Sequence, residues 1–362
     1  MEKIEDVLKK DSFNKEDIIR LLSLDQDESK MLYLRSKEIK EKYVGNKVYL
    51  RGLIEFSNIC AKDCLYCGIR KSNDTYDRYN LQNEDILEAV KFAKEAKYGS
   101  VVLQSGELES PAFTERVETL VQQISDAFDP KLGITLSCGE QSEETYRRWK
   151  NAGADRYLLR IETSNEELYY RIHPRDPKHS FQNRLAALER LKKLGYQTGT
   201  GIMVGLPTQT IEDIADDILF MQKYDMDMCG IGPYIESENT PLAQDFENPM
   251  SLDDRFHLAL KTISIIRIMM KDVNIAASTA LQSIDKVGRE KAINVAANIF
   301  MPNITPTENR KEYLLYDNKP CIDESASECQ SCVIGRIALT GNEVAYDELG
   351  TSKHYERRMA KK

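Results

Sequence analysis

After position 45, short apolar runs alternate with longer amphipathic segments, and this alternation constrains the fold more than any other feature of the chain. The apolar runs predict strands at 48–56, 100–104, 133–137, 157–161, 198–204, 228–231, 275–278 and 295–300. The segments between them predict helices at 83–96, 111–127, 142–152, 181–194, 211–223 and 252–270. Strands that alternate with helices form parallel sheets, and eight such strands can close on themselves. We therefore expect an α/β fold, a (β/α)8 TIM-type barrel, with a doubly wound open sheet as the alternative.

The residues before this alternation differ because their apolar positions follow a helical spacing throughout. This spacing predicts helices at 4–10, 15–22 and 26–42, and Asn14 and Asp25 are candidate caps for the second and third of them. No stretch rich in Pro, Gly or Ser divides the rest of the chain. We therefore expect three regions: an N-terminal helical collar at 1–45, a barrel at 46–301 and a C-terminal extension with cysteines at 302–362.

Charge and hydropathy exclude several classes of protein. The chain has 50 Lys and Arg residues against 59 Asp and Glu residues, a formal net charge of −9, whereas surfaces that bind nucleic acids need clustered basic residues in excess. The charged N-terminus has no apolar run long enough for a signal peptide. No stretch of about 18 apolar residues predicts a membrane span. We therefore expect a cytoplasmic protein that binds neither nucleic acid nor membrane.

Six of the eight cysteines lie in two short groups, and such clustering favours metal binding over disulfide formation. The first group, Cys60, Cys64 and Cys67, follows the first predicted strand. A structural zinc ion needs four ligands, and no His precedes His173. A 4Fe-4S cluster, in contrast, accepts three protein ligands and leaves one iron open. The sequence therefore predicts a 4Fe-4S cluster, with a zinc site completed from a distant part of the chain or a reduced cysteine-rich loop as the alternatives.

The motif Cys60-x3-Cys64-x2-Cys67, with the aromatic Tyr66 before its last cysteine, resembles that of the radical S-adenosylmethionine (SAM) superfamily. The resemblance implies an enzyme in which the amino and carboxylate groups of SAM bind the open iron. It also implies that an electron from the cluster breaks a carbon–sulfur bond of SAM. The resulting 5′-deoxyadenosyl radical would then abstract hydrogen from a substrate, while the protein supplies orientation and excludes competing reactions.

Segments at the ends of other predicted strands fit the same resemblance. Gly106 and Glu107 match the end of a glycine-rich turn that contacts the SAM amino group, although Ser105 departs from the usual Gly-Gly-Glu. An arginine such as Arg184 suits the SAM carboxylate as a bidentate donor. The resemblance implies cofactor contacts from Tyr66, Gly106, Glu107, Glu162, Arg184 and Met203. The alternative is that these charged residues form structural ion pairs.

A further likeness, to the HydE-type maturases of FeFe-hydrogenase, covers nearly all of the chain. It is carried by the segments 101–107, 134–140, 157–163, 180–185, 201–210, 227–235, 278–281 and 296–306. The likeness implies that the radical acts on a cysteine-bound organometallic iron that carries CO and cyanide. It implies catalytic roles for Cys60, Cys64, Cys67 and Arg160, and a substrate pocket formed by Thr135, Arg160, Ser278, Thr279 and Tyr316. Ile161 replaces a His found in several members, and by strand alternation its side chain points away from its neighbours.

The second cysteine group, Cys321, Cys329 and Cys332, resembles an auxiliary three-cysteine site of some of these maturases. The resemblance implies an accessory 2Fe-2S or 4Fe-4S cluster that the radical chemistry does not need. A zinc site completed by His354 and a set of free thiols are the alternatives. The isolated Cys138 and Cys229 have apolar neighbours and are predicted to be buried thiols.

Two other functions compete with the maturase hypothesis. One is a related radical SAM mutase of the methylornithine synthase type, which resembles the chain over its first 250 residues or so. The tail cysteines and the hydroxyl groups of the predicted pocket favour the maturase over this mutase. The other is a non-catalytic metal-binding scaffold, which has no need of polar residues at several strand ends. For the maturase we also expect transient contacts with other hydrogenase maturation proteins and with an electron donor.

Overall fold

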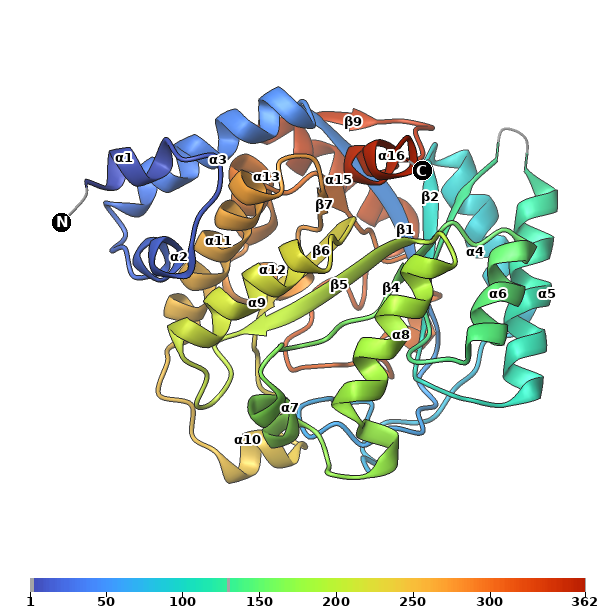
Figure 1. The fold of residues 1–362 in the computed structure, drawn as a ribbon. Coiled ribbons are helices and arrows are strands. Elements are labelled where there is room, and N and C mark those ends of the chain that lie inside the picture. The colour runs from blue at the N-terminus through green and yellow to red at the C-terminus, as the bar shows by residue number, and fades with distance from the viewer. Residues whose placement is uncertain (1–2, 129–130, 362) are drawn as a thin grey trace.

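The structure is a computed structural model that describes residues 3–128 and 131–361. Within these residues, eight parallel strands line a common interior, and helices pack around them (Figure 1). The strands follow the order β7-β6-β5-β4-β3-β2-β1-β8. Their bounds are β1 Lys47–Ser57, β2 Ser100–Ser105, β3 Gly133–Ser137, β4 Arg156–Leu158, β5 Gln197–Val204, β6 Met228–Pro233, β7 Asn274–Ile275 and β8 Ile299–Phe300.

The sheet closes where β8 lies between β1 and β7. Tyr49 and Leu50 of β1 pair with β8, and on the other side Ala276, directly after β7, forms a bridge with Ile299. The amide of Ala277 also donates a hydrogen bond to the carbonyl of Ile299 over 2.9 Å. A closed sheet has no free edges, so the expected (β/α)8 barrel is confirmed and the open sheet is excluded.

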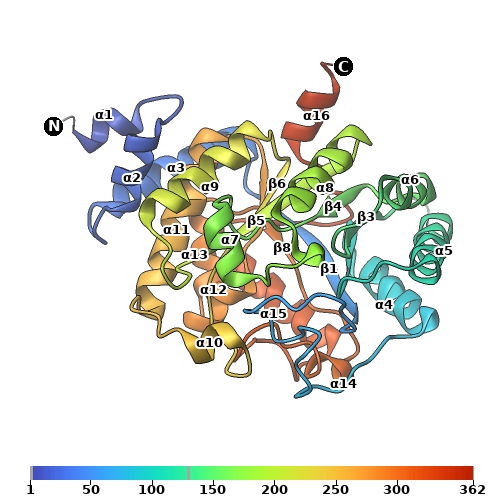
Figure 2. The ribbon, with the colours of Figure 1, turned by 60° about the horizontal axis from the view of Figure 1, so that its bottom comes forward.

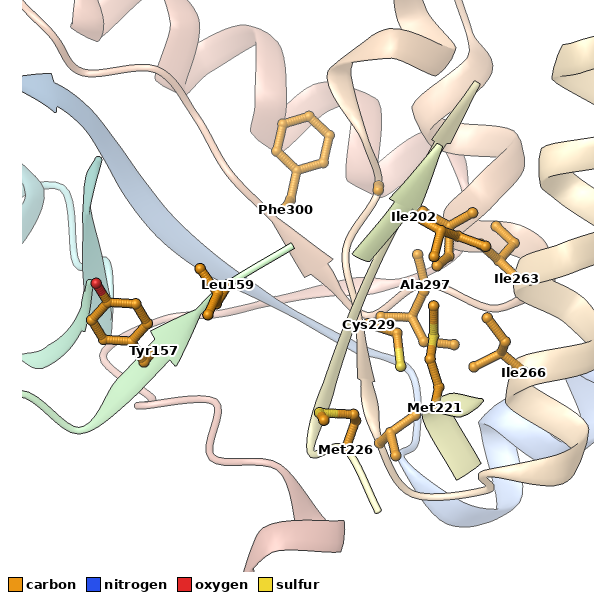
Figure 3. Close-up of a cluster of buried hydrophobic side chains, with 14 of the residues drawn as sticks. Tyr157, Leu159, Ile202, Met221, Met226, Cys229, Ile263, Ile266, Ala297 and Phe300 are labelled. Atoms are coloured by element: carbon orange, nitrogen blue, oxygen red, sulfur yellow. The ribbon is translucent and has the colours of Figure 1, made fainter. Parts of the chain in front are cut away.

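The core lies between the strands and the surrounding helices because alternate strand residues face outward. Figure 3 shows part of it, in which Ile202 of β5 and Cys229 of β6 lie in one cluster with Met221, Ile263 and Ile266 from two helices. The residues between these apolar positions face the interior of the barrel. The helices that follow β1 to β7 are α4 Asn83–Glu95, α5 Pro111–Ala127, α6 Glu143–Ala152, α7 Glu166–Ile172, α8 Phe181–Lys193, α9 Ile211–Lys223, α10 Pro241–Asp245, α11 Leu252–Met269, α12 Thr279–Ile284 and α13 Gly288–Val295.

Three strands, β4, β7 and β8, are shorter than the sequence predicts. β7 ends at Ile275 because the predicted last residue, Ser278, instead caps α12. β4 ends early because the side chain of Thr200 takes the place of a backbone partner: its hydroxyl accepts from the amide of Ile161 (3.1 Å) and donates to the carbonyl of Leu159 (2.9 Å). β8 starts late because the residues before it form α13, which buries Ala292 and Ile293. The short helices α7, α10 and α12 are not predicted, since five to seven residues are too few to show a helical period.

The N-terminal region is helical as predicted, with α1 Ile4–Leu8, α2 Lys15–Leu22 and α3 Ser29–Tyr43. Asn14 caps α2 by accepting from the amide of Asp17 over 2.8 Å. Asp25 instead caps a turn that precedes α3, where it accepts from the amide of Glu28 over 2.9 Å. In Figure 1 these helices lie beside α9 and α11. They therefore cover one side of the barrel wall.

The C-terminal residues return to the barrel as α14 Thr307–Arg310, α15 Ala326–Leu339, β9 Glu343–Ala345 and α16 Lys353–Met359. β9 pairs in parallel with the first residues of β1. Beyond it, the carbonyl of Gly350 accepts hydrogen bonds from the interior side chains of Arg51 (3.1 Å) and Asn274 (2.8 Å). This segment therefore closes the end of the barrel at which the strands begin. The boundaries of the three regions stay a prediction.

None of the helices in the described parts of the chain is both long and apolar enough to cross a membrane.

Candidate active site

The residues expected to bind the cofactor gather at the end of the barrel where the strands finish. This end comes toward the viewer in Figure 2. The cysteine-bearing loop follows β1, Gly106 and Glu107 follow β2, Glu162 follows β4, and Met203 lies near the end of β5. Parallel strands bring these positions together, and active sites of such barrels lie at this end.

The first cysteine group lies on a loop whose backbone supports its sulfur atoms. The Sγ atom of Cys60 accepts from the amide of Lys62 (3.4 Å) and from that of Glu107 (3.3 Å). The second of these bonds joins the loop to the end of β2. Burial raises the pKa of Cys64 and raises that of Cys67 to about 12. These thiols therefore keep their protons until a metal displaces them.

The three thiols fit an iron–sulfur cluster better than a single metal ion. In the described residues, no three His, Cys, Asp or Glu side chains lie close enough together to hold one metal ion. A structural zinc ion needs four ligands, and this loop offers three cysteines. In a 4Fe-4S cluster each thiolate binds a different iron, which suits three cysteines spread along a loop.

Four charged side chains form a buried network beside the cysteine loop. Lys62 pairs with Glu107 (2.9 Å) and with Glu140 (3.5 Å). Arg184 pairs with Glu140 (2.6 Å) and lies 3.7 Å from Glu107. Each side chain is only about a tenth exposed, and two positive charges balance two negative ones. Burial raises the pKa of Glu107, and the two cations oppose that rise. The network can therefore exchange partners with a ligand that carries both an ammonium and a carboxylate group.

Sequence reasoning missed two members of this network, Lys62 and Glu140. Both lie within segments that carried the likeness to known enzymes, Lys62 inside the cysteine motif and Glu140 at the end of 134–140. Their spacing in the sequence does not show that they meet. A charged residue between two cysteines, and a second carboxylate at a strand end, are the signals that could have indicated them.

Arg160 and Glu162 bind each other. The guanidinium of Arg160 donates from Nε and Nη2 to the two carboxylate oxygens of Glu162, both over 2.7 Å, and from Nη1 to the carbonyl of Gly230 over 2.7 Å. Gly201 leaves room for it, because a Cβ atom there would lie 2.6 Å from Nη1. The guanidinium charge is therefore balanced before any anionic group enters the barrel.

The residues of the expected substrate pocket come from separate strands. The hydroxyl groups of Thr279 and Tyr316 lie 2.8 Å apart, which joins α12 to the segment after β8. Ser278 caps α12 by accepting from the amide of Ala280 over 3.3 Å. Thr135 lies on β3, and its buried hydroxyl has no hydrogen-bond partner. An unpartnered buried hydroxyl is unfavourable, so it favours a polar ligand at that position.

Two further interior arginines lie near the closed end of the barrel. Arg51 and Arg156 are almost fully buried, and neither forms an ion pair with a carboxylate in the described residues. Burial, together with the charge of Arg156, holds the pKa of Arg51 well below its usual range. Sequence reasoning missed both residues. They place two guanidinium groups in the interior near the end at which the strands begin.

The surroundings of the second cysteine group differ from those of the first. Cys321 lies in a turn, Cys329 is buried in α15 and Cys332 is exposed on the same helix. A hydrogen bond with Cys329 lowers the pKa of Cys321 to about 6, and nearby Arg289 adds to the shift. His354 does not complete this site, because its ring nitrogens lie 3.0 Å from Asp272 and 2.7 Å from Asp225. The isolated thiols Cys138 and Cys229 are buried, which confirms that prediction.

Comparison with known proteins supports the same site. Residues 54–221 match the model of the "Radical SAM superfamily". The chain is 42% identical over 353 residues to the FeFe hydrogenase maturase subunit HydE of Thermotoga maritima, and the match covers 96% of this chain and 97% of that protein. It is 30% identical over 335 residues to 3-methylornithine synthase of Methanosarcina acetivorans, covering 91% of this chain and 90% of that one.

Among solved structures, methylornithine synthase (PylB) superposes on the chain with a TM-score of 0.79 at 28% identity, covering 95% of this chain and 97% of that chain. The chain has a barrel closed by eight parallel strands, a three-cysteine loop after β1 and sequence matches along nearly its whole length. These observations all indicate the same family. The family implies a 4Fe-4S cluster and SAM as cofactors. The chain belongs to the radical SAM superfamily and is a radical SAM enzyme.

Proposed function

We propose that the chain is a maturase of the HydE type, which reductively cleaves SAM and acts on a cysteine-bound organometallic iron precursor of the FeFe-hydrogenase H cluster. The observation that carries the proposal is the cysteine loop joined to the buried network of Lys62, Glu107, Glu140 and Arg184. The 42% identity to HydE along 96% of the chain supports the choice of reaction.

The chain's own residues supply the contacts that SAM requires. Cys60, Cys64 and Cys67 would hold the cluster, and when bound the cluster and SAM together supply an electron and a 5′-deoxyadenosyl radical. The carboxylate of Glu107 suits the SAM ammonium, and the guanidinium of Arg184 suits its carboxylate. These assignments account for the presence of both charge signs in one buried network.

Other residues would orient the adenosyl part and the substrate. Glu162 suits the ribose hydroxyl groups, since its carboxylate lies at the barrel mouth beside Arg160. Tyr66 and Met203 contact the smaller apolar cluster near the mouth, and an adenine ring suits such a surface. The hydroxyl groups of Thr135, Ser278, Thr279 and Tyr316 suit the polar groups of a cysteine-bound iron. The closed floor of the barrel would keep water from the reaction.

Anaerobic SAM cleavage tests the radical chemistry. The protein is reconstituted with iron and sulfide, reduced with dithionite and given SAM, and 5′-deoxyadenosine is measured. We expect turnover by the wild-type protein and none by the Cys60→Ala protein. Failure of the fully loaded wild-type protein to release 5′-deoxyadenosine would refute the proposal.

Maturation of a hydrogenase tests the choice of substrate. The protein is added to an apo-hydrogenase together with the other maturation proteins, and hydrogen evolution is measured with and without it. We expect activity only when it is present. SAM cleavage without maturation would leave the radical chemistry standing and remove the substrate assignment.

The second candidate is a mutase of the methylornithine synthase type, favoured by the TM-score of 0.79 with PylB. Incubation with lysine, SAM and reductant distinguishes the two, because the mutase would form a branched isomer of lysine. We expect no such product from this chain.

We also propose that Cys321, Cys329 and Cys332 hold an accessory iron–sulfur cluster.

A further inference from the structure

The turn that follows β4 holds Glu162 in a backbone conformation that residues with side chains rarely adopt. The φ angle of Glu162 is 64°, in the left-handed region, where the Cβ atom crowds the backbone. Contacts with β5 fix the residue: its amide donates to the carbonyl of Gly201 (3.0 Å), and its carbonyl accepts from the amide of Met203 (3.2 Å). Such strain persists only where the surroundings fix it, and it gathers at functional sites.

A carboxylate of α9 holds the two residues that come directly after this glutamate. The Oδ1 atom of Asp217 accepts from the hydroxyl groups of Ser164 (2.7 Å) and Thr163 (3.3 Å). It also accepts from the backbone amide of Ser164. The helix that follows β5 is therefore tied to the turn that follows β4. The turn that carries Glu162 and the strand that carries Met203 are thereby fixed relative to each other.

Stability alone does not explain a carboxylate at this position. Asp217 has no exposed surface, and its second oxygen, Oδ2, has no hydrogen-bond partner. No Lys or Arg forms an ion pair with it in the part of the chain that the structure describes. Burial raises the pKa of Asp217 to about 7, because a charge without a counter-ion is costly inside a protein. The burial cost is offset by the three donors of the turn that Asp217 satisfies, so its carboxyl group matters for the geometry of the turn.

We propose that Asp217 is a positioning residue for cofactor binding. It fixes the turn so that the carboxylate of Glu162, and through it the guanidinium of Arg160, keep their places at the barrel mouth. Asp217 does not touch the cofactor. The inference rests on the proposed function, because it assumes that Glu162 contacts SAM.

Substitutions of Asp217 test the inference by their effect on SAM affinity. Asp217→Ala removes the acceptor, whereas Asp217→Asn keeps one oxygen for Ser164. Asp216→Asn is the matched control, since Asp216 is half-exposed on the same helix and pairs with Lys15 over 2.7 Å. SAM is titrated into the reduced, reconstituted protein, and binding is followed by the EPR signal of the cluster.

We expect the Kd for SAM to rise about tenfold in Asp217→Ala, to rise less in Asp217→Asn, and to stay unchanged in Asp216→Asn. At saturating SAM, the rate of 5′-deoxyadenosine release should stay within about twofold of wild type, because the change affects binding more than chemistry. Iron content and circular dichroism check that each variant folds.

Ser164→Ala removes one hydroxyl from the other side of the contact and leaves Asp217 intact. We expect a rise of about threefold in Kd. Wild-type affinity in Asp217→Ala overturns the inference, and so does an equal loss of affinity and maximal rate in a protein that has lost iron. A wild-type protein that binds no SAM refutes the proposed function, and this inference falls with it. If the wild-type protein binds SAM and the Asp217 variants bind it with the same affinity, this inference fails and the proposed function stands.

Discussion

The chain carries two groups of three cysteines in very different surroundings. The first lies on a loop at the ends of β1 and β2, where backbone amides donate to Cys60 and a buried ion network lies beside it. The second is divided between a turn and α15, and Cys332 is exposed. Beside the first group, Lys62, Arg184 and two carboxylates form one buried network, whereas the charged groups around Cys321 include Arg289 and Arg336. The comparison teaches that the neighbouring side chains, more than the cysteine spacing, make the first group the candidate for a catalytic cluster.

Replacement of the cysteines should give the largest difference between the two groups in the rate of SAM cleavage. We expect Cys60→Ala, Cys64→Ala and Cys67→Ala each to lower SAM cleavage at least about a thousandfold, because the cluster loses a ligand. The protein with alanine at Cys321, Cys329 and Cys332 should retain at least half of the wild-type rate. The measurement is anaerobic release of 5′-deoxyadenosine. Loss of cleavage in the tail variant would contradict the division of roles.

Replacement of an arginine near each cysteine group should change the KM for SAM to different extents. Arg184→Gln leaves the buried carboxylates of Glu107 and Glu140 with one cation between them. We expect the KM for SAM to rise about 10- to 100-fold. The control, Arg336→Gln, removes an ion pair with Glu290 that joins α15 to α13, and it should leave KM unchanged. Steady-state assays of SAM cleavage measure both KM values. An equal change in KM for the two variants would contradict this prediction.

Thiol reactivity in the metal-free protein should differ with pH. The pKa of Cys321 is lowered to about 6 and that of Cys67 is raised to about 12, so at pH 7 only Cys321 is mainly thiolate. We expect iodoacetamide to modify Cys321 at least about tenfold faster than Cys67. The rate at Cys321 should fall as the pH drops below 6, because protonation removes the thiolate. Mass spectrometry of digested protein measures both rates, and equal rates at pH 7 would refute this prediction.

The smallest effect is expected from the cap of the tail helix. Ser325 caps α15 by accepting from the amide of Glu328 over 3.3 Å. Ser325→Ala should lower the free energy of unfolding by about 1 kcal/mol and Tm by about 2 °C, without a change in SAM cleavage. Ser331→Ala, an exposed change on the same helix, is the control. A loss of cleavage in Ser325→Ala would show that the tail affects the radical site.

The barrel could be predicted from the sequence because each strand and helix pair must bury one face. The capped helices α5, α6, α8 and α9 match their predicted ranges closely for the same reason. The return of the C-terminal residues could not be predicted. β9 has only three residues, too few to show a strand pattern. At the floor of the barrel, the carbonyl of Gly350 accepts the hydrogen bonds, and a backbone carbonyl cannot be recognised from the residue type.

The candidate site was predictable as a set of strand ends, since parallel strands bring their ends together. Glu107 and Glu162 are placed there by strand order, whereas Arg184 lies in the first turn of α8. Two partners of Glu107 and Arg184 were not predicted: Glu140 comes from another strand end, and Lys62 from within the cysteine motif. Which charges pair depends on side-chain positions in three dimensions. The left-handed conformation of Glu162 is likewise visible only in the structure.

The account depends on a 4Fe-4S cluster held by Cys60, Cys64 and Cys67 with one iron free for SAM. The most direct measurement is the EPR spectrum of the reduced, reconstituted protein that carries alanine at the three tail cysteines, recorded before and after SAM is added. The account predicts about four iron and four sulfide ions per chain and a cluster signal that changes when SAM binds. A signal that SAM leaves unchanged, in protein with a full cluster, would contradict it.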